Sequence, residues 1–172
     1  LFVGLLNGYI LMKLWGKVNK GGNLEGDDGR IIKKLHELID QSDIVVTHNG
    51  ERFDIPRINS RFIINNLPPT SPYFSIDTYR ICKKQFGFSS NKLDALASYF
   101  HFDHKLETNF ELWKKCIEGD EESLEYMLTY NKRDVTLLEE VFIKLRPWIK
   151  GGPNTSVYFN STKPMCCKCG ST

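Results

Sequence analysis

The sequence has 172 residues, of which 41% are hydrophobic and 12% aromatic, as in an ordinary globular protein rather than a disordered chain. Its formal net charge of +2 gives no global basic field toward a polyanion, and its apolar runs are far shorter than the roughly 18 residues of a membrane span. This length suits one well-cored domain, which we place at residues 1–150, followed by a polar tail at residues 151–172.

The first half of the chain alternates between strand and helix patterns. β-branched and aromatic residues predict a strand at residues 9–18, and glycines mark a loop after it. Apolar residues at helical spacing predict a helix around residues 31–39. The apolar run at residues 44–47 predicts a strand buried on both faces, and a helix is expected from residue 55 to about residue 66.

The second half continues the alternation with a short strand and three helices. The strand is expected at residues 75–79, and two helices are expected at residues 91–100 and 112–117. Gly119-Asp120 then reads as a stop followed by a cap, and the longest helix is predicted at residues 121–145. Short strands interleaved with helices indicate an α/β fold.

The segment Asn49–Asp54 follows the predicted strand at residues 44–47 and leads into a helix. A carboxylate at such a junction projects from the edge of a sheet, which is a common place for sites in α/β folds. Asp54 is therefore a candidate site residue. The alternative is that Asp54 caps the helix while Asn49-Gly50 forms a turn.

Tyr130 and Asp134 lie four residues apart in the last predicted helix, so they project from one face of it. The same stripe continues through Leu137 and Val141, which places Asp134 at the border of the buried face. A carboxylate there needs a partner or a metal ion. The alternative is a surface aspartate paired with a neighbouring Lys or Arg.

Taken together, these two segments indicate a function more specifically than either segment does alone. Asn49-x-x-x-Phe53-Asp54, followed some 75 to 80 residues later by Tyr130-x-x-x-Asp134, resembles the second and third motifs of the DnaQ-like 3′–5′ exonucleases. The tyrosine points to the DEDDy branch of this ribonuclease H-like superfamily. Further segments that look like phage and bacterial members are residues 43–50, 76–78, 90–94, 110–113 and 130–140. The resemblance implies a ribonuclease H-like fold, with a central mixed β-sheet flanked by α-helices.

The resemblance also implies a two-metal phosphodiester hydrolase that acts on DNA or RNA, at single-stranded ends. Asp54 and Asp134 would be ligands of two Mg²⁺ or Mn²⁺ ions, which prefer carboxylate oxygens. Tyr130 would orient the attacking water, because free tyrosine keeps its proton up to a pH of about 10. Asn49 and Phe53 would help to place the terminal nucleotide.

Basic residues near these segments are candidates for phosphate contacts, which give affinity without sequence choice. The alternative for each of them is ordinary solvated surface. The candidates are Arg52, Arg57, Lys92, Lys132 and Arg133.

Members of this family carry an Asp-x-Glu motif on the first strand, and no such motif precedes Asp54. Either that strand lies upstream of Leu1, or residues 1–6 form it with apolar side chains in place of the carboxylates. The second case leaves too little negative charge for a tight two-metal site and predicts an inactive nucleic-acid-binding or scaffold domain. We favour the first, because Asp54 and the Tyr130–Asp134 pair are both present. A structure-specific endonuclease is the remaining alternative.

The five cysteines do not form a secreted disulfide framework and suit a reducing compartment, so we expect a cytoplasmic protein. The family resemblance implies that its cell is a bacterium or a phage-infected host. Cys82 and Cys116 stand alone and are expected to be buried free thiols. Cys166 and Cys169 have the Cys-x-x-Cys spacing of half a zinc site. The alternative for this pair is a flexible tail with reactive thiols.

Overall fold

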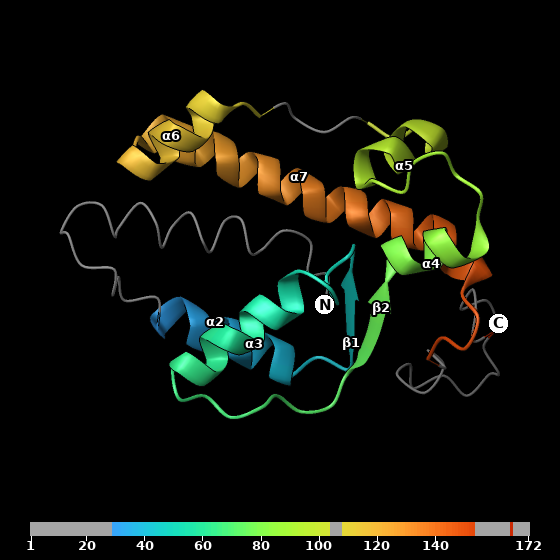
Figure 1. Ribbon diagram of the computed structural model, residues 1–172, viewed down its shortest axis with the longest axis horizontal. Coiled ribbons are helices and arrows are strands. Elements are labelled where there is room, and N and C mark those ends of the chain that lie inside the picture. The colour runs from blue at the N-terminus through green and yellow to red at the C-terminus, as the bar shows by residue number, and fades with distance from the viewer. Residues whose placement is uncertain (1–28, 104–107, 154–165, 167–172) are drawn as a thin grey trace.

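The computed structural model describes residues 29–103, 108–153 and 166 (Figure 1). Helices outnumber strands among these residues, and the alternation expected of an α/β fold is confirmed. In chain order the elements are α2 (Gly29–Asp40), β1 (Ile44–Thr47), α3 (Asp54–Ile64), β2 (Phe74–Asp77), α4 (Thr78–Gln85), α5 (Leu93–Phe100), α6 (Phe110–Glu118), α7 (Glu121–Leu145) and the 3₁₀ turn η1 (Arg146–Trp148).

The strands β1 and β2 pair in parallel, with Ile44 opposite Phe74 and Thr47 opposite Asp77. Both strands therefore end at the same edge of the sheet. The chain leaves that edge twice, once from β1 toward α3 and once from β2 directly into α4. The expected mixed sheet also includes the strand predicted at residues 9–18, which lies outside the described residues.

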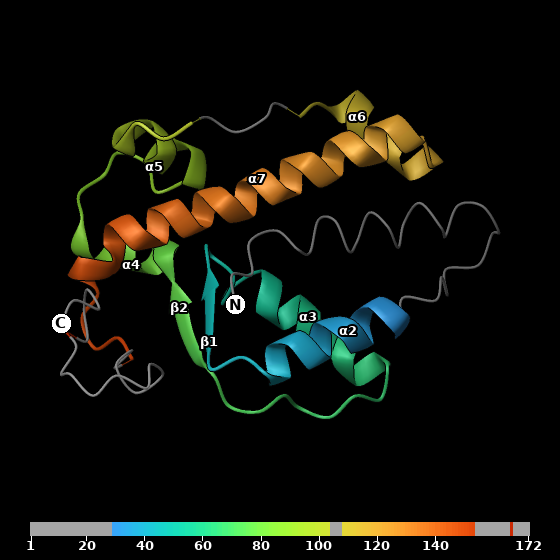
Figure 2. The ribbon, with the colours of Figure 1, turned by 180° about the vertical axis from the view of Figure 1, so that it is seen from behind.

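The two faces of β1 belong to two different hydrophobic cores, because successive side chains of a strand point to opposite faces. Val45 packs with the apolar sides of α2 and α3, whereas Val46 joins Ile76 of β2 in the second core. That second core takes its other buried members from α4, α5 and α7, namely Cys82, Leu93, Leu96, Ala97, Leu137, Leu138, Val141 and Leu145. The two strands thus lie between two helical layers, as Figures 1 and 2 show.

The long helix α7 has the predicted bounds, because the signals at both sides of its start are local. Gly119 ends α6 in the left-handed region, with φ of 87°. The side chain of Asp120 then accepts a hydrogen bond from the Ser123 N–H at 2.9 Å, which caps α7. The apolar stripe that follows packs the C-terminal half of α7 against the sheet.

One predicted element is wrong in its second half. The strand expected at residues 75–79 ends at Asp77, and Thr78 begins α4, a helix that the sequence pattern did not reveal. The reason is the side chain of Asp77, which accepts the N–H groups of Tyr79 and Arg80 and so starts a helix. Elsewhere the bounds differ from prediction by a few residues. No helix in the described ranges is long and apolar enough to cross a bilayer.

Candidate active site

The turn from β1 to α3 is tightly folded against the end of β1. Asn49 is in the left-handed region with φ of 63°, which asparagine tolerates better than most residues. Gly50 is buried, and a Cβ there would lie 2.6 Å from Cγ2 and 2.8 Å from Oγ1 of Thr47. The turn expected at Asn49-Gly50 is therefore confirmed, and its second residue has to be glycine because Thr47 fills the space.

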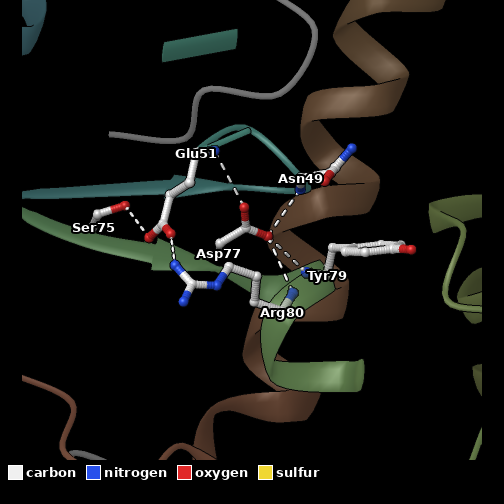
Figure 3. Close-up of polar contacts among 6 residues, drawn as sticks. All are labelled: Asn49, Glu51, Ser75, Asp77, Tyr79 and Arg80. Atoms are coloured by element: carbon white, nitrogen blue, oxygen red, sulfur yellow. Dashed lines mark hydrogen bonds and ion pairs between the residues drawn. The ribbon is translucent and has the colours of Figure 1, made fainter. Parts of the chain in front are cut away.

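Asp77 holds this turn from the neighbouring strand (Figure 3). Its Oδ1 accepts the N–H of Asn49 at 2.9 Å, and its Oδ2 accepts the N–H of Glu51 at 3.2 Å. The same Oδ1 accepts the N–H groups of Tyr79 and Arg80 at 3.0 and 3.3 Å, as the N-cap of α4. One buried carboxylate, 4% exposed, thus accepts hydrogen bonds from four backbone N–H groups. It joins the turn after β1 to the start of α4.

Glu51 makes a second link between the turn and β2. It accepts a hydrogen bond from the Ser75 hydroxyl at 2.9 Å and forms an ion pair with Arg80 of α4. Figure 3 shows Glu51, Ser75 and the guanidinium group of Arg80 on one side of Asp77, with Asn49 on the other. The turn is thereby fixed by side chains as well as by backbone hydrogen bonds.

His48 ties the same turn to α4 and to the loop before α5. Its Nδ1 lies 2.8 Å from Oγ1 of Thr78, and its Nε2 lies 2.9 Å from the carbonyl oxygen of Asn91. The Thr78 hydroxyl donates to the carbonyl of Thr47 at 2.9 Å, so it accepts from Nδ1. Both ring nitrogens therefore face hydrogen-bonding oxygens, and His48 links β1, α4 and the loop before α5.

Asp54 is the first residue of α3 and is 8% exposed. The N-cap position belongs to Phe53, so Asp54 does not occupy the capping position that was its alternative interpretation. Phe53 is half exposed, and the guanidinium carbon of Arg57 lies 3.5 Å from the centre of its ring. Arg57 also donates to the Phe53 carbonyl at 3.0 Å. A buried carboxylate and an exposed aromatic ring therefore stand side by side in the chain at the end of the turn.

In α7, Asp134 is completely buried and Tyr130 is half-buried one helical turn before it. The alternative of a surface aspartate at position 134 is therefore wrong. Leu137 and Leu138, the next turn of the helix, share a core with Val46 of β1. Arg133 is turned elsewhere, because it pairs with Glu140 at 3.0 Å and donates to the carbonyl of Asp103 at 2.8 Å.

The structure thus brings Asn49, Phe53 and Asp54 together in one turn and the first turn of α3. Lys92, at the N-cap position of α5, is exposed and follows Asn91, whose carbonyl faces His48. Tyr130 and Asp134 form a second group on α7. Within residues 29–103, 108–153 and 166, no group of three or more His, Cys, Asp or Glu side chains is arranged to hold a metal ion.

The organising residues of the site were the ones that the sequence did not reveal. Asp77 is the N-cap of α4 and also binds the neighbouring turn. Its hydrogen bonds to Asn49 and Glu51 join the ends of two different strands, and no local sequence pattern predicts such a contact. Asp94 lies in the first turn of α5, while Lys92 occupies the N-cap position.

The described cysteines divide into buried and exposed thiols. Cys82 and Cys116 are free and buried, as predicted. Burial, with a smaller contribution from the charge of Asp77, raises the pKa of Cys82 to about 11. Burial likewise raises the pKa of Cys116, with a smaller contribution from Asp120. Cys166 is exposed, and Cys169 lies outside the described residues, so a zinc site at this pair stays a prediction.

Comparison with known proteins agrees with this fold. The family described as the RNase_H superfamily matches residues 19–146, most of the chain. The chain belongs to this superfamily, and the predicted ribonuclease H-like fold is confirmed. A curated relative is the PolC-type DNA polymerase III of Ureaplasma parvum serovar 3 (strain ATCC 700970), with 29% identity over 121 residues. That similarity covers 70% of this chain but spans only 8% of the polymerase.

Proposed function

We propose that this domain is a metal-dependent 3′–5′ exonuclease of the DEDDy branch. The observation that carries the proposal is the pair of buried carboxylates, Asp54 and Asp134, in a chain of the ribonuclease H superfamily. Burying a carboxylate is costly unless it is hydrogen-bonded, paired or bound to a cation. Both lie in segments that resemble exonuclease motifs, with Tyr130 one helical turn from Asp134.

Asp54 and Asp134 are chemically suited to Mg²⁺ or Mn²⁺, because both offer hard carboxylate oxygens. In the described part of the chain these two carboxylates do not form a complete ligand set, so the proposal requires a further acidic ligand from residues outside it. When bound, two such ions would supply an activated water and charge stabilisation for the leaving oxygen.

The other residues of the segment Asn49–Asp54 would bind and orient the strand end. The exposed ring of Phe53 offers a surface for stacking on a terminal base, and Asn49 stands four residues before it in the rigid turn. Arg52, Arg57 and Lys92 are exposed and would contact phosphates. Tyr130 would orient the attacking water through its hydroxyl. The similarity to a DNA polymerase III supports DNA as the first substrate to test.

The decisive experiment follows the shortening of a 5′-labelled single-stranded oligonucleotide of DNA or RNA, with Mg²⁺ or Mn²⁺. We expect a ladder of products from the wild type. Asp54→Asn and Asp134→Asn should each slow it by about three orders of magnitude, since metal-assisted charge stabilisation amounts to several kcal/mol. Asp94→Asn, an exposed aspartate of α5, is the matched control and should keep full activity.

The alternatives give different products. A circular single strand that is cut would indicate an endonuclease. Binding without cleavage of DNA or RNA, in either metal and by well-folded protein, would contradict the enzyme and leave a nucleic-acid-binding domain. Wild-type activity in both Asp54→Asn and Asp134→Asn would remove these residues from the site, whatever the activity.

A further inference from the structure

A groove of about 850 Å³ runs along β2 and α4, beside the turn Asn49–Asp54. Its lining comes from the whole of β2, from one side of α4, from the segment that follows α7, and from Glu51. Among the described residues, β2 pairs with β1 alone, and the groove follows β2 from Phe74 to Asp77. The proposed catalytic residues Asp54, Tyr130 and Asp134 are not part of its lining.

The groove concentrates positive charge in a chain that is nearly neutral. Lys83, Lys84 and Lys150 line it and are exposed, together with Arg80. Arg80 is already neutralised by its ion pair with Glu51. The other acidic residue of the lining, Asp77, is 4% exposed and surrounded by four N–H donors. Three lysines therefore face the groove against little exposed negative charge, which favours an anionic occupant.

The groove also offers aromatic surface. Trp148 is 60% exposed, and its ring is held at one edge by Phe86, with centroids 5.5 Å apart and an interplanar angle of 69°. Phe74, at the start of β2, is 41% exposed. A positively charged groove with exposed aromatic rings is the combination by which proteins bind single-stranded nucleic acid without sequence preference. An acidic peptide could pair with the lysines but would gain less from stacking on the aromatic rings, so nucleic acid fits the groove better.

The groove adjoins the candidate active site through Glu51 and Asp77. Glu51 lines the groove and belongs to the turn that carries Asn49 and Phe53, while Asp77 lines it and binds the Asn49 amide. Figure 3 shows the Glu51–Arg80 pair at this junction. A strand whose end is held near Phe53 would therefore pass beside the mouth of the groove.

We propose that this groove binds single-stranded nucleic acid, several nucleotides away from the end held at the candidate active site. The idea that the strand continues to that site rests on the proposed function. The binding itself does not, because it depends on Lys83, Lys84, Lys150 and Trp148 and requires no metal ion.

The test measures binding of a fluorescent oligo(dT) of about 20 nucleotides to the full-length chain in the presence of EDTA, so that metal-dependent cleavage is suppressed. Lys83→Ala/Lys84→Ala should lower the affinity about tenfold. It should also reduce the slope of log K against log salt by about 1.4, the value for two lost phosphate contacts. Trp148→Ala should lower the affinity by about tenfold with little change in this slope.

The matched control is Lys33→Ala/Lys34→Ala, which removes an adjacent exposed lysine pair from α2 on the other side of the sheet. It should change the affinity by less than about twofold. Equal losses from both lysine pairs, or no loss from Lys83→Ala/Lys84→Ala, would overturn the proposal. Binding of a poly-glutamate peptide by the groove lysines, without binding of oligo(dT), would also overturn it and indicate a protein partner.

The two proposals fail separately. If oligonucleotide binding depends on Lys83 and Lys84 but the protein cleaves no substrate, the proposed exonuclease activity is contradicted and the proposed binding groove is supported. If cleavage is normal but the groove variants leave the oligonucleotide affinity unchanged, the binding groove is contradicted and the exonuclease activity is supported.

Discussion

The two halves of the candidate site are held in different ways. The turn Asn49–Asp54 has no regular structure of its own before α3, and its shape depends on Asp77, a residue of another strand. Tyr130 and Asp134 lie within α7, where the backbone hydrogen bonds are local and an apolar stripe fixes which face is buried.

This difference teaches where the site is fragile. α7 is held by local backbone hydrogen bonds and by many packed apolar residues, so losing one side-chain hydrogen bond removes only a small part of what fixes this half of the site. Glu51 and His48 add side-chain links to the turn, but the carboxylate of Asp77 and the bare Cα of Gly50 make contacts that no neighbouring residue can replace. Changes in residues that support the turn should therefore cost more than comparable changes in α7.

The largest effect is expected from Asp77→Ala. It leaves four N–H groups without their acceptor, two in the turn and two at the start of α4, and should lower the free energy of unfolding by roughly 3–5 kcal/mol. Asn131→Ala on α7 removes a buried amide that donates to the Met127 carbonyl at 2.8 Å, and should cost only about 1 kcal/mol. Urea unfolding of both variants measures the difference, and equal losses would contradict the comparison.

The reactivity of two buried cysteines can show whether Asp77→Ala opens the structure locally or unfolds it globally. Cys82 belongs to the core shared by the sheet, α4 and α7, whereas Cys116 packs with Met127 at the other end of α7. Because burial raises the pKa of Cys82 to about 11, the native thiol stays protonated and unreactive at pH 8. In Asp77→Ala, mass spectrometry after iodoacetamide should find faster labelling of Cys82 and unchanged labelling of Cys116. Equal acceleration at both would mean global unfolding instead.

A smaller loss is expected from Gly50→Ala. The new methyl group would collide with the Thr47 side chain, and overpacking of this kind costs about 1–3 kcal/mol. Gly87→Ala is the control, because a Cβ at Gly87 meets no atom within 4 Å. Thermal unfolding should show a clear decrease in Tm for the first variant and almost none for the second. A normal Tm for Gly50→Ala would show that the turn adapts more easily than this comparison assumes.

The smallest effect is expected from Arg57→Ala. It removes a cation over the Phe53 ring on an exposed surface, an interaction of about 0.5–1 kcal/mol. The fold should persist with a nearly unchanged Tm, whereas the affinity for single-stranded oligonucleotides should decrease. Arg61→Ala, one turn further along α3, tests whether any loss is specific to the Phe53 contact. Equal losses from both variants would remove the ring contact from the explanation.

The fold was readable from the sequence wherever the signal was local. The bounds of α7 follow from Gly119 and Asp120 together with a sustained apolar period, and the strand Ile44–Thr47 follows from four consecutive residues. The helix α4 was not predicted, because Thr78–Gln85 is mostly polar and starts directly at the end of a strand.

The candidate site was readable in part for the same reason. Asp54 and Asp134 could be singled out from their places beside a strand and on a helix face, and both are buried. The contacts of His48 with Thr78 and Asn91, and those of Asp77 with the turn, join residues far apart in the chain. Such contacts depend on strand register, which the sequence of either strand alone does not contain.

The division of β1 between two cores has a consequence for how the protein folds during synthesis. The first core is built from residues between Ile32 and Phe62, which leave the ribosome close together in time. The second cannot close until α7 has been made, because Leu137, Leu138 and Val141 cover Val46 and Ile76. Until then one face of the nascent sheet is exposed to water. This interval is when the growing chain is most prone to aggregate and most in need of a chaperone.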